Sequence, residues 1–387
     1  MNPMLEYIDE ELLRLDSLGL LRNLKTIHGP QGPKAVVNGR EALIMCSNDY
    51  LGLAGHPLVK EAAIEAVQKW GAGAGASRLV SGTMEPHVML EERIKSFKRA
   101  DAALLFNSGY NANLGVISAL LDRSSEVFSD KLNHASIVDA CVLSRAKVRR
   151  YPSRDVNVLE RLLKASQAKK KLVVTDSVFS MDGTIAPLRD ITGLLDRYGA
   201  MLLVDDAHAT GVLGPGGRGS LEHFNISHPA VITMGTLGKA LGSFGAFITG
   251  SSALIDLMVS KARPFIYTTA LPPSVCGAAI KAFDIVENEP GLRQRLWENT
   301  ARLKEGLSRL GLDILGSETP IVPIKVGTAK KAVDISDRLL ENGVFIQAIR
   351  PPTVPEGTSR LRMTLSASHT AEDIDSALSA LREALDG

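Results

Sequence analysis

The segment that decides the fold is MLLVDDAH at residues 201–208, where an apolar run ends on two acidic residues and then a histidine. A short, nearly continuous apolar run is typical of a strand buried on both faces of a parallel sheet. Two more segments have this form: LVVTD at 172–176 runs into SVFSMDG, and VITMG at 231–235 runs into TLGK. Because ligands bind at the carboxyl ends of parallel strands, we expect the three polar clusters to meet in one cleft.

The central part of the chain, residues 57–250, alternates between short apolar runs and helical patterns. This alternation predicts an α/β fold in which helices cover both faces of a parallel sheet. The predicted strands are Ala102–Phe106, Glu126–Ser129, Leu172–Asp176, Met201–Asp205, Val231–Gly235 and Phe244–Thr249. Helical patterns continue through 251–310.

The two ends of the chain have other patterns. Residues 1–22 carry Leu5, Ile8, Leu12 and Leu15 at helical spacing, which predicts an amphipathic docking helix. After residue 311 the pattern predicts a small α+β lobe, with strands over 321–326, 344–347 and 361–366, a helix over 329–342 and a terminal helix from Ala371. We therefore predict an N-terminal helix and extended segment at 1–50, a large domain at 51–290 and a small C-terminal domain at 291–387.

Composition excludes several classes of protein. With 45% apolar and 22% charged residues, the chain has the make-up of a soluble globular protein. A net charge of +1 gives no reason to expect nucleic acid or an acidic membrane surface as a partner. The three cysteines, Cys46, Cys141 and Cys276, form no C-x-x-C pair, which favours a reducing, cytoplasmic location. We find neither a signal peptide nor an apolar stretch of about 18 residues that would span a membrane.

The three polar clusters match the needs of pyridoxal 5'-phosphate (PLP). This cofactor needs a lysine for its aldehyde, and a carboxylate that keeps its ring nitrogen protonated so that the ring accepts electrons. Lys239, Asp205 and His208 lie at predicted strand ends, where they could meet the aldehyde, the ring nitrogen and the ring hydroxyl. Taken singly, Asp205 could be a helix cap and His208 a structural residue. The presence of all three residues, each at a predicted strand end, favours a cofactor site over these separate structural roles.

A phosphate cradle is predicted at FNSGYN, residues 106–111, which follows a strand and opens a helix. Gly109 permits a close approach, and the first N–H groups of the helix would face the anion. Thr236 could add a hydroxyl group. The alternative is an ordinary strand-to-helix turn. The glycine-rich segment 71–77 follows a helix rather than a strand, so it is a poor match to a dinucleotide fingerprint.

The chain resembles the α-oxoamine synthases, a family of fold-type I PLP enzymes, over nearly its whole length. The matching segments are SNDYLGL at 47–53, NSGY at 107–110, NHAS at 133–136, SMDG at 180–183, DDAH at 205–208, TLGK at 236–239 and RLR at 360–362. The resemblance implies a large domain with a mostly parallel sheet covered by helices, a small α+β C-terminal domain, and a homodimer with the active site at its interface.

The resemblance also implies roles for individual residues. Lys239 would form the Schiff base and act as the base, Asp205 would pair with the ring nitrogen, and His134 would stack on the ring. The implied catalytic residues are Lys239, His134, Asp205 and His208. The implied cofactor-binding residues are Gly109, Tyr110, His134, Ser180, Asp205, His208, Thr236 and Lys239, with Thr268 and Thr269 reaching the partner's phosphate. The implied substrate-binding residues are Arg22, Asn48, His134, Thr353 and Arg362, and no metal ligand is implied.

Some of these residues have a second interpretation. His134 could cap the helix that begins near Ala135, and Arg22 could be an ordinary basic residue at a helix C-terminus. Arg360 and Arg362 share one face of a strand, so the residues alone do not decide which one holds the substrate carboxylate. The family pattern favours Arg362, whose guanidinium would bind a carboxylate through two hydrogen bonds.

Substrate choice depends on AIRPPTVP at residues 348–355. This segment resembles the branch of the family that condenses L-alanine with a pimeloyl thioester, giving 8-amino-7-oxononanoate, CO2 and the free thiol carrier in biotin biosynthesis. The sequence does not decide whether the thiol carrier is coenzyme A or an acyl carrier protein. One alternative is glycine C-acetyltransferase or another α-oxoamine synthase. A second, from a different class, is a binding protein on the same fold, which would lack an intact set of catalytic groups.

Overall fold

The computed structural model describes residues 2–386, which divide into two compact units. One unit comprises the residues up to Gly52, Met181–Thr184 and the residues from Gln294 on. The other comprises Leu53–Ser180 and Ile185–Arg293. Every helix within the described residues is too short or too polar to span a bilayer.

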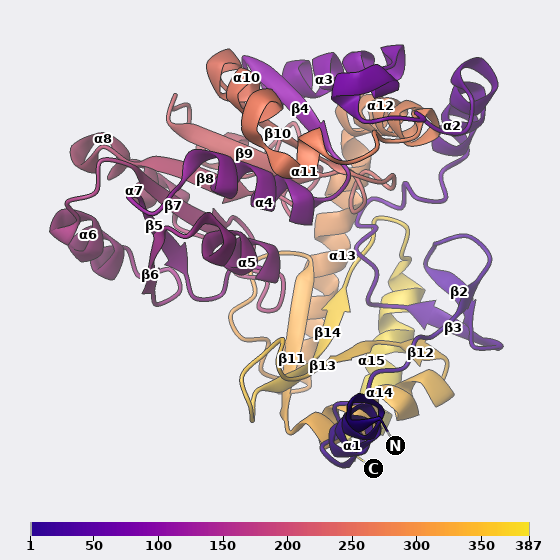
Figure 1. Cartoon of the computed structure of the whole chain (residues 1–387). Coiled ribbons are helices and arrows are strands. Elements are labelled where there is room, and N and C mark those ends of the chain that lie inside the picture. The colour runs from indigo at the N-terminus through magenta and orange to yellow at the C-terminus, as the bar shows by residue number, and fades with distance from the viewer. Residues whose placement is uncertain (1, 387) are drawn as a thin grey trace. The chain divides into compact units, whose positions relative to one another are not determined.

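The larger unit is built on a seven-stranded sheet with the order β4-β10-β9-β8-β7-β5-β6 (Figure 1). Its strands are β4 (Ala102–Phe106), β5 (Glu126–Asp130), β6 (Lys147–Tyr151), β7 (Lys171–Asp176), β8 (Met201–Asp205), β9 (Val231–Thr236) and β10 (Ala246–Gly250). Each strand pair from β6 to β9 is parallel, whereas β10 is antiparallel to both β9 and β4. The sheet is therefore mostly parallel.

Two expectations about this sheet need correction. The strand predicted at Phe244–Thr249 begins at Ala246 and runs against its neighbours, so the sheet is not purely parallel. The strand β6 was not predicted, because its residues KVRRY are mostly charged. It pairs only with β5, at the edge of the sheet, where a strand needs no continuous apolar run.

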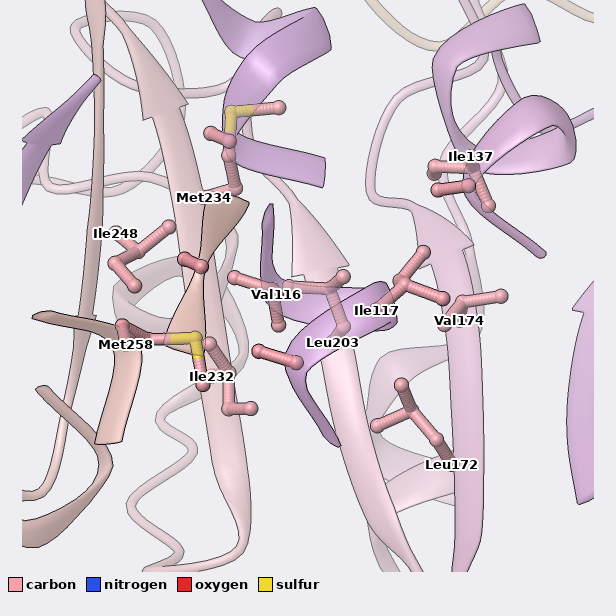
Figure 2. Close-up of a cluster of buried hydrophobic side chains, with 14 of the residues drawn as sticks. Val116, Ile117, Ile137, Leu172, Val174, Leu203, Ile232, Met234, Ile248 and Met258 are labelled. Carbon is pink, nitrogen blue, oxygen red and sulfur yellow. The ribbon is translucent and has the colours of Figure 1, made fainter. Parts of the chain in front are cut away.

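Alternating side chains bury both faces of this sheet. On one face, strand residues such as Leu172, Val174 and Leu203 pack against Val116 and Ile117 of the helix α4 (Gly109–Leu120) (Figure 2). On the other face, residues such as Val173, Leu202 and Val204 pack against the helices α6 (Val156–Ala165), α7 (Leu188–Thr192) and α8 (Leu195–Tyr198). This period of two explains why the strands read as continuous apolar runs, because successive side chains enter opposite cores.

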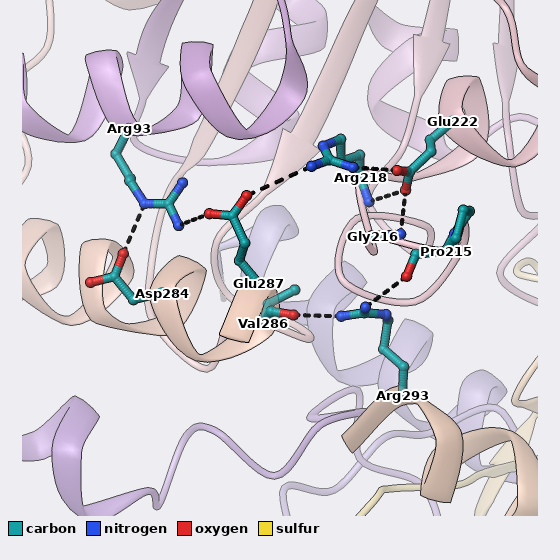
Figure 3. A network of polar contacts seen from close by, with 9 residues as sticks. All are labelled: Arg93, Pro215, Gly216, Arg218, Glu222, Asp284, Val286, Glu287 and Arg293. Atoms are coloured by element: carbon teal, nitrogen blue, oxygen red, sulfur yellow. Dashed lines mark hydrogen bonds and ion pairs between the residues drawn. The ribbon is translucent and has the colours of Figure 1, made fainter. Parts of the chain in front are cut away.

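The helical segments of this unit are α2 (Pro57–Trp70), η1 (Arg78–Gly82), α3 (Glu85–Lys98), α4 (Gly109–Leu120), α5 (Ala135–Ser144), α6 (Val156–Ala165), α7 (Leu188–Thr192), α8 (Leu195–Tyr198), α9 (Ser220–Phe224), α10 (Ser252–Lys261), α11 (Arg263–Ile266) and α12 (Pro273–Asn288). An ion-pair network joins α3, α9 and α12 through Arg93, Arg218 and Glu287 (Figure 3). Arg293, at the start of α13 (Pro290–Arg309), donates to the Pro215 and Val286 carbonyls and fixes the loop before α9.

The smaller unit has two sheets, ordered β1-β2-β3-β12 and β11-β14-β13. Its strands are β1 (Ile27–His28), β2 (Lys34–Val37), β3 (Arg40–Ile44), β11 (Ile321–Gly327), β12 (Val344–Phe345), β13 (Gln347–Ile349) and β14 (Ser359–Thr364). Its helices are α1 (Pro3–Ser17), most of α13, α14 (Ala329–Glu341) and α15 (Ala371–Asp386).

Three boundaries in this unit differ from the predictions. The first helix ends at Ser17 rather than near residue 22, and none of its residues is buried in this chain. The single strand predicted over 344–347 is divided, because β12 pairs with β3 whereas β13 pairs with β14. The strand predicted over 361–366 is β14, which begins and ends two residues earlier.

Candidate active site

A cavity of about 220 Å³ lies in the larger unit, where β7, β8 and β9 end. The side chains around it come from residues far apart in the sequence: Gly109, Tyr110, His134, Ser136, Asp176, Ser180, Asp205, Ala207, His208, Met234, Thr236 and Lys239. The three polar clusters of the sequence analysis therefore meet in one place, as predicted from the strand ends. Eight of the predicted site residues line this cavity together, namely Gly109, Tyr110, His134, Ser180, Asp205, His208, Thr236 and Lys239.

Lys239 lies in the turn that joins β9 to β10. Its Nζ atom is 2.9 Å from Nε2 of His208, three residues beyond the end of β8. The turn is held by backbone hydrogen bonds that Leu237 N donates to Gly245 O and Gly242 N donates to Lys239 O. Gly242 has φ +59°, and a Cβ atom there would come within 2.3 Å of the backbone nitrogen of Ala54. The turn that carries the lysine thus requires glycine at this position.

Asp205, the last residue of β8, is buried, and each of its carboxylate oxygens accepts a hydrogen bond. One carboxylate oxygen accepts from Asn113 Nδ2 at 2.8 Å and the other from the backbone N–H of Ala207 at 2.9 Å. Burial raises the pKa of Asp205, and the charge of Lys239 and the Asn113 hydrogen bond act in the opposite direction. A buried carboxylate at a cavity wall is suited to pair with a cationic ring nitrogen.

His134 caps a helix and also lies at the cavity wall. It is the N-cap of α5, where Nδ1 accepts from the backbone N–H of Ser136 at 3.2 Å. Its ring also lines the cavity. Burial lowers the pKa of His134, which favours a neutral imidazole.

The predicted phosphate cradle has the expected local structure. Ser108 caps α4, with Oγ accepting from Asn111 N at 3.2 Å, and the first turn of the helix begins at Gly109. A Cβ atom on Gly109 would lie 3.0 Å from the Thr236 methyl carbon, so the space beside Thr236 suits glycine. Tyr110 is 42% exposed, and its hydroxyl group donates to Asp139 on α5.

Thr268 and Thr269 lie elsewhere in this unit. Asn107 Nδ2 donates to Thr268 Oγ1 at 3.4 Å and to the carbonyl of Thr269 at 2.8 Å. The described residues that line the cavity in this chain do not include either threonine.

Four of the five predicted substrate residues form two groups in the smaller unit, whereas His134 belongs to the larger one. Arg362 is buried, and its Nη2 atom donates to Asn48 Oδ1 at 3.2 Å. Arg22 Nη2 lies 3.4 Å from Thr353 Oγ1, and both residues are exposed. Arg360 instead forms a 2.5 Å ion pair with Asp182. That carboxylate compensates the charge of Arg360.

Sequence comparison places these residues in a known family. The sequence profile of aminotransferase class I and II matches residues 40–381. The 8-amino-7-oxononanoate synthase of Geobacter sulfurreducens is 53% identical over 381 residues, with 98% of this chain and 97% of that protein covered. The synthase of Geobacter metallireducens is 56% identical over 368 residues, with 94% of each chain covered. The chain belongs to the aminotransferase class I and II family.

Solved structures of family members have the same fold. One, described as SPT with a PLP internal aldimine, aligns with a TM-score of 0.93 at 31% identity and covers 99% of this chain and 97% of its own. The 8-amino-7-oxononanoate synthase of Francisella tularensis aligns with a TM-score of 0.78 at 31% identity and covers 89% and 98%. This likeness confirms the fold-type I prediction.

The cavity fits PLP in three respects. It holds a lysine amine, a buried carboxylate for the ring nitrogen, and a helix that starts at a closely packed glycine for the phosphate. Two buried oxygen atoms around it, Asn113 Oδ1 and Asp176 Oδ1, have no hydrogen-bond partner among residues 2–386. Unpaired buried acceptors are costly in a closed protein interior and are typical of a binding site.

The sequence analysis missed Asn113, Ser136 and Asp176. Asn113 lies four residues after Gly109, one turn into α4, so its position on the same helix face as the phosphate cradle could have indicated it. Asp176 ends its strand as Asp205 does, but only the sheet register shows that the two are neighbours.

Proposed function

We propose that this chain catalyses the decarboxylating condensation of L-alanine with a pimeloyl thioester, giving 8-amino-7-oxononanoate, CO2 and the free thiol carrier. The observation that carries the proposal is the full-length similarity to 8-amino-7-oxononanoate synthases, at 53% identity over 381 residues. It is supported by a cavity that brings together eight of the residues predicted to bind PLP. The alternative, a binding protein on the same fold, would lack some of the catalytic groups. The four residues predicted to be catalytic all line the cavity, so this alternative has no support.

PLP, when bound, supplies an aldehyde that takes the amino group of L-alanine and a ring that accepts the electrons of its α-carbon. Lys239 Nζ is the group that removes the α-proton and later returns a proton to that carbon. Its contact with His208, another residue that lines the cavity, supports a position of the amine beside the cofactor. Asp205 holds a proton on the ring nitrogen through its carboxylate.

The remaining residues are proposed to bind and orient the cofactor and the substrates. Gly109 and Thr236, with the first N–H groups of α4, are proposed to bind the phosphate, and His134 to cover the ring. Arg362 is proposed to bind the substrate carboxylate, because its guanidinium can form two parallel hydrogen bonds to a carboxylate. Arg22 and Thr353 are proposed to contact the acyl substrate.

We also propose that the enzyme is a cytoplasmic homodimer in which Thr268 and Thr269 reach the partner's phosphate. The three cysteines are unbridged, as in a reducing compartment. Thr269 is exposed beside the phosphate cradle segment, where a neighbouring chain can meet it.

The substrate proposal is tested by direct competition. Purified protein with PLP is given L-alanine or glycine, each with pimeloyl-CoA, a pimeloyl-acyl carrier protein or acetyl-CoA, and the products are identified by mass spectrometry. We expect the highest kcat/KM with L-alanine and a pimeloyl thioester. One methyl group changes binding by only about 1–3 kcal/mol, so slow use of glycine is compatible with the proposal. A preference for glycine with acetyl-CoA would assign the chain to the glycine C-acetyltransferases instead.

A further inference from the structure

A second carboxylate lies beside Asp205 in the cavity. Asp176 is the last residue of β7, Asp205 is the last residue of β8, and the two are direct partners in the parallel register. Partners in neighbouring parallel strands project to the same face of a sheet. Both side chains line the cavity, and the two residues are only 4% and 5% exposed.

Asp176 also fixes the loop that carries His134. One carboxylate oxygen, Oδ2, accepts from the backbone N–H of His134 at 3.1 Å. The backbone N–H of Asp176 donates to Asn133 Oδ1 at 2.9 Å, and Asn133 Nδ2 donates to the carbonyl of Val174 at 2.8 Å. The start of α5 is thereby attached to the end of β7 by three hydrogen bonds.

The other oxygen of Asp176, Oδ1, has no hydrogen-bond partner within residues 2–386 although it is buried. Burial and the neighbouring charge of Asp205 both raise the pKa of Asp176, and the cation of Lys239 opposes them. Two adjacent buried carboxylates are unfavourable unless positive charge lies close to them. A cationic ring in the cavity would supply that charge.

We propose that Asp176 is a positioning residue of the reaction, whose negative charge stands beside Asp205 to hold the cationic cofactor ring while its Oδ2 atom fixes His134 against the cavity. The charge is the testable part, because a neutral side chain of the same shape can still accept the His134 hydrogen bond. The inference rests on the proposed function for the choice of L-alanine as substrate.

The experiment compares Asp176→Asn, which keeps the shape and removes the charge, with Asp176→Glu, which keeps the charge. The matched control is Asp130→Asn. Asp130 is a buried aspartate at the end of the neighbouring strand β5, it accepts from Leu132 N and Arg154 N, and it is not among the residues that line the cavity. For each purified variant the affinity of the apoprotein for PLP is titrated, and the exchange of the α-proton of L-alanine in heavy water is followed by NMR.

We expect Asp176→Asn to bind PLP about tenfold more weakly and to exchange the α-proton about tenfold more slowly. Asp176→Glu and Asp130→Asn should stay within about threefold of the wild type. A folded Asp176→Asn variant with wild-type PLP affinity would overturn the proposal and leave only a structural role. If the thermal transition shows that Asp176→Asn does not fold, Asp176→Glu decides, since a tenfold loss of PLP affinity in that folded, charged variant would also overturn it.

The test separates this inference from the proposed function. PLP affinity is measured without substrate, so a chain that prefers glycine and acetyl-CoA would fail the substrate experiment and could still show the Asp176 effect. In that case the exchange of the glycine α-protons replaces that of L-alanine.

Discussion

The amine of Lys239 and the imidazole of His208 are in hydrogen-bond contact, with 2.9 Å between Nζ and Nε2. The two residues belong to different strand ends, β9 and β8, and meet only because these strands are neighbours in the sheet. An ammonium and an imidazolium would repel each other at this distance, so at least one of the two nitrogens is neutral. The contact joins the two side chains that were expected to meet the aldehyde and the ring hydroxyl of the cofactor.

Replacing Lys239 with alanine is expected to abolish turnover, because both the covalent attachment of PLP and the base are lost. PLP should still bind through the phosphate cradle. Activity is measured as product formation from L-alanine and pimeloyl-CoA, and PLP binding by equilibrium dialysis. The control is Lys261→Ala, a change at an exposed lysine at the end of α10, which should leave the rate unchanged. Turnover of Lys239→Ala within tenfold of the wild type would refute the assignment.

Replacing Asp205 with asparagine is expected to slow the removal of the α-proton of L-alanine. The carboxylate that keeps the ring nitrogen protonated is lost, whereas the amide can still accept from Ala207 N. A loss of roughly a hundredfold or more is expected, at about 1.4 kcal/mol for each factor of ten. Deuterium exchange at the α-carbon, followed by NMR, checks this. An exchange rate equal to that of the wild type would contradict the role of Asp205.

The strands of the central sheet could be predicted well because each buried run is local in the sequence. The strands at 102–106 and 201–205 match the prediction to the residue, since continuous apolar runs are what two buried faces require. The direction of β10 could not be predicted in this way, because strand direction depends on the connection and not on local hydrophobicity. The β6 strand was not predicted because it lies at the edge of the sheet and carries charged residues in place of a continuous apolar run.

The residues of the site divide in the same way, into those that the local sequence indicates and those that it does not. Lys239, Asp205 and His208 could be identified because each ends or follows a strand and has a distinctive chemical group. Asp176 and Asn113 were missed because their place in the site depends on register and on a side-chain hydrogen bond across elements. The strand register and this hydrogen bond join residues that are far apart in the sequence, so no spacing within the sequence predicts them.

The turn that carries Lys239 should not tolerate a side chain at position 242. Gly242→Ala would place a methyl group against the backbone of Ala54 and would keep a residue other than glycine at φ +59°. We expect a loss of stability of about 1–3 kcal/mol, seen as a lower melting temperature. Gly73→Ala is the control, because no atom lies within 4 Å of its Cβ position, and it should change stability by less than about 0.5 kcal/mol. Equal melting temperatures for the two variants would show that the turn can adjust.

Exchanging each of the two buried arginines of β14 for lysine should show which one binds the substrate carboxylate. Arg362→Lys loses the two-pronged guanidinium, so the KM for L-alanine should rise by about tenfold. Arg360→Lys keeps a positive charge beside Asp182, and its KM should stay within about threefold of the wild type. Steady-state kinetics with varied L-alanine measures both. The reverse order of effects would assign the carboxylate to Arg360.

A shared active site predicts complementation between two inactive chains. One chain carries Lys239→Ala, and the other carries Thr268→Ala with Thr269→Ala. If the threonines serve the partner's phosphate, the heterodimer has one site that lacks both lysine and threonines, and one site that lacks neither. Heterodimers isolated through two different tags should therefore have about half of the wild-type activity per dimer, well above either parent. If the threonines serve their own chain, every site in the heterodimer is impaired, and its activity will not exceed half that of the threonine variant. The two outcomes can be told apart if the threonine variant, measured alongside, is much less active than the wild type.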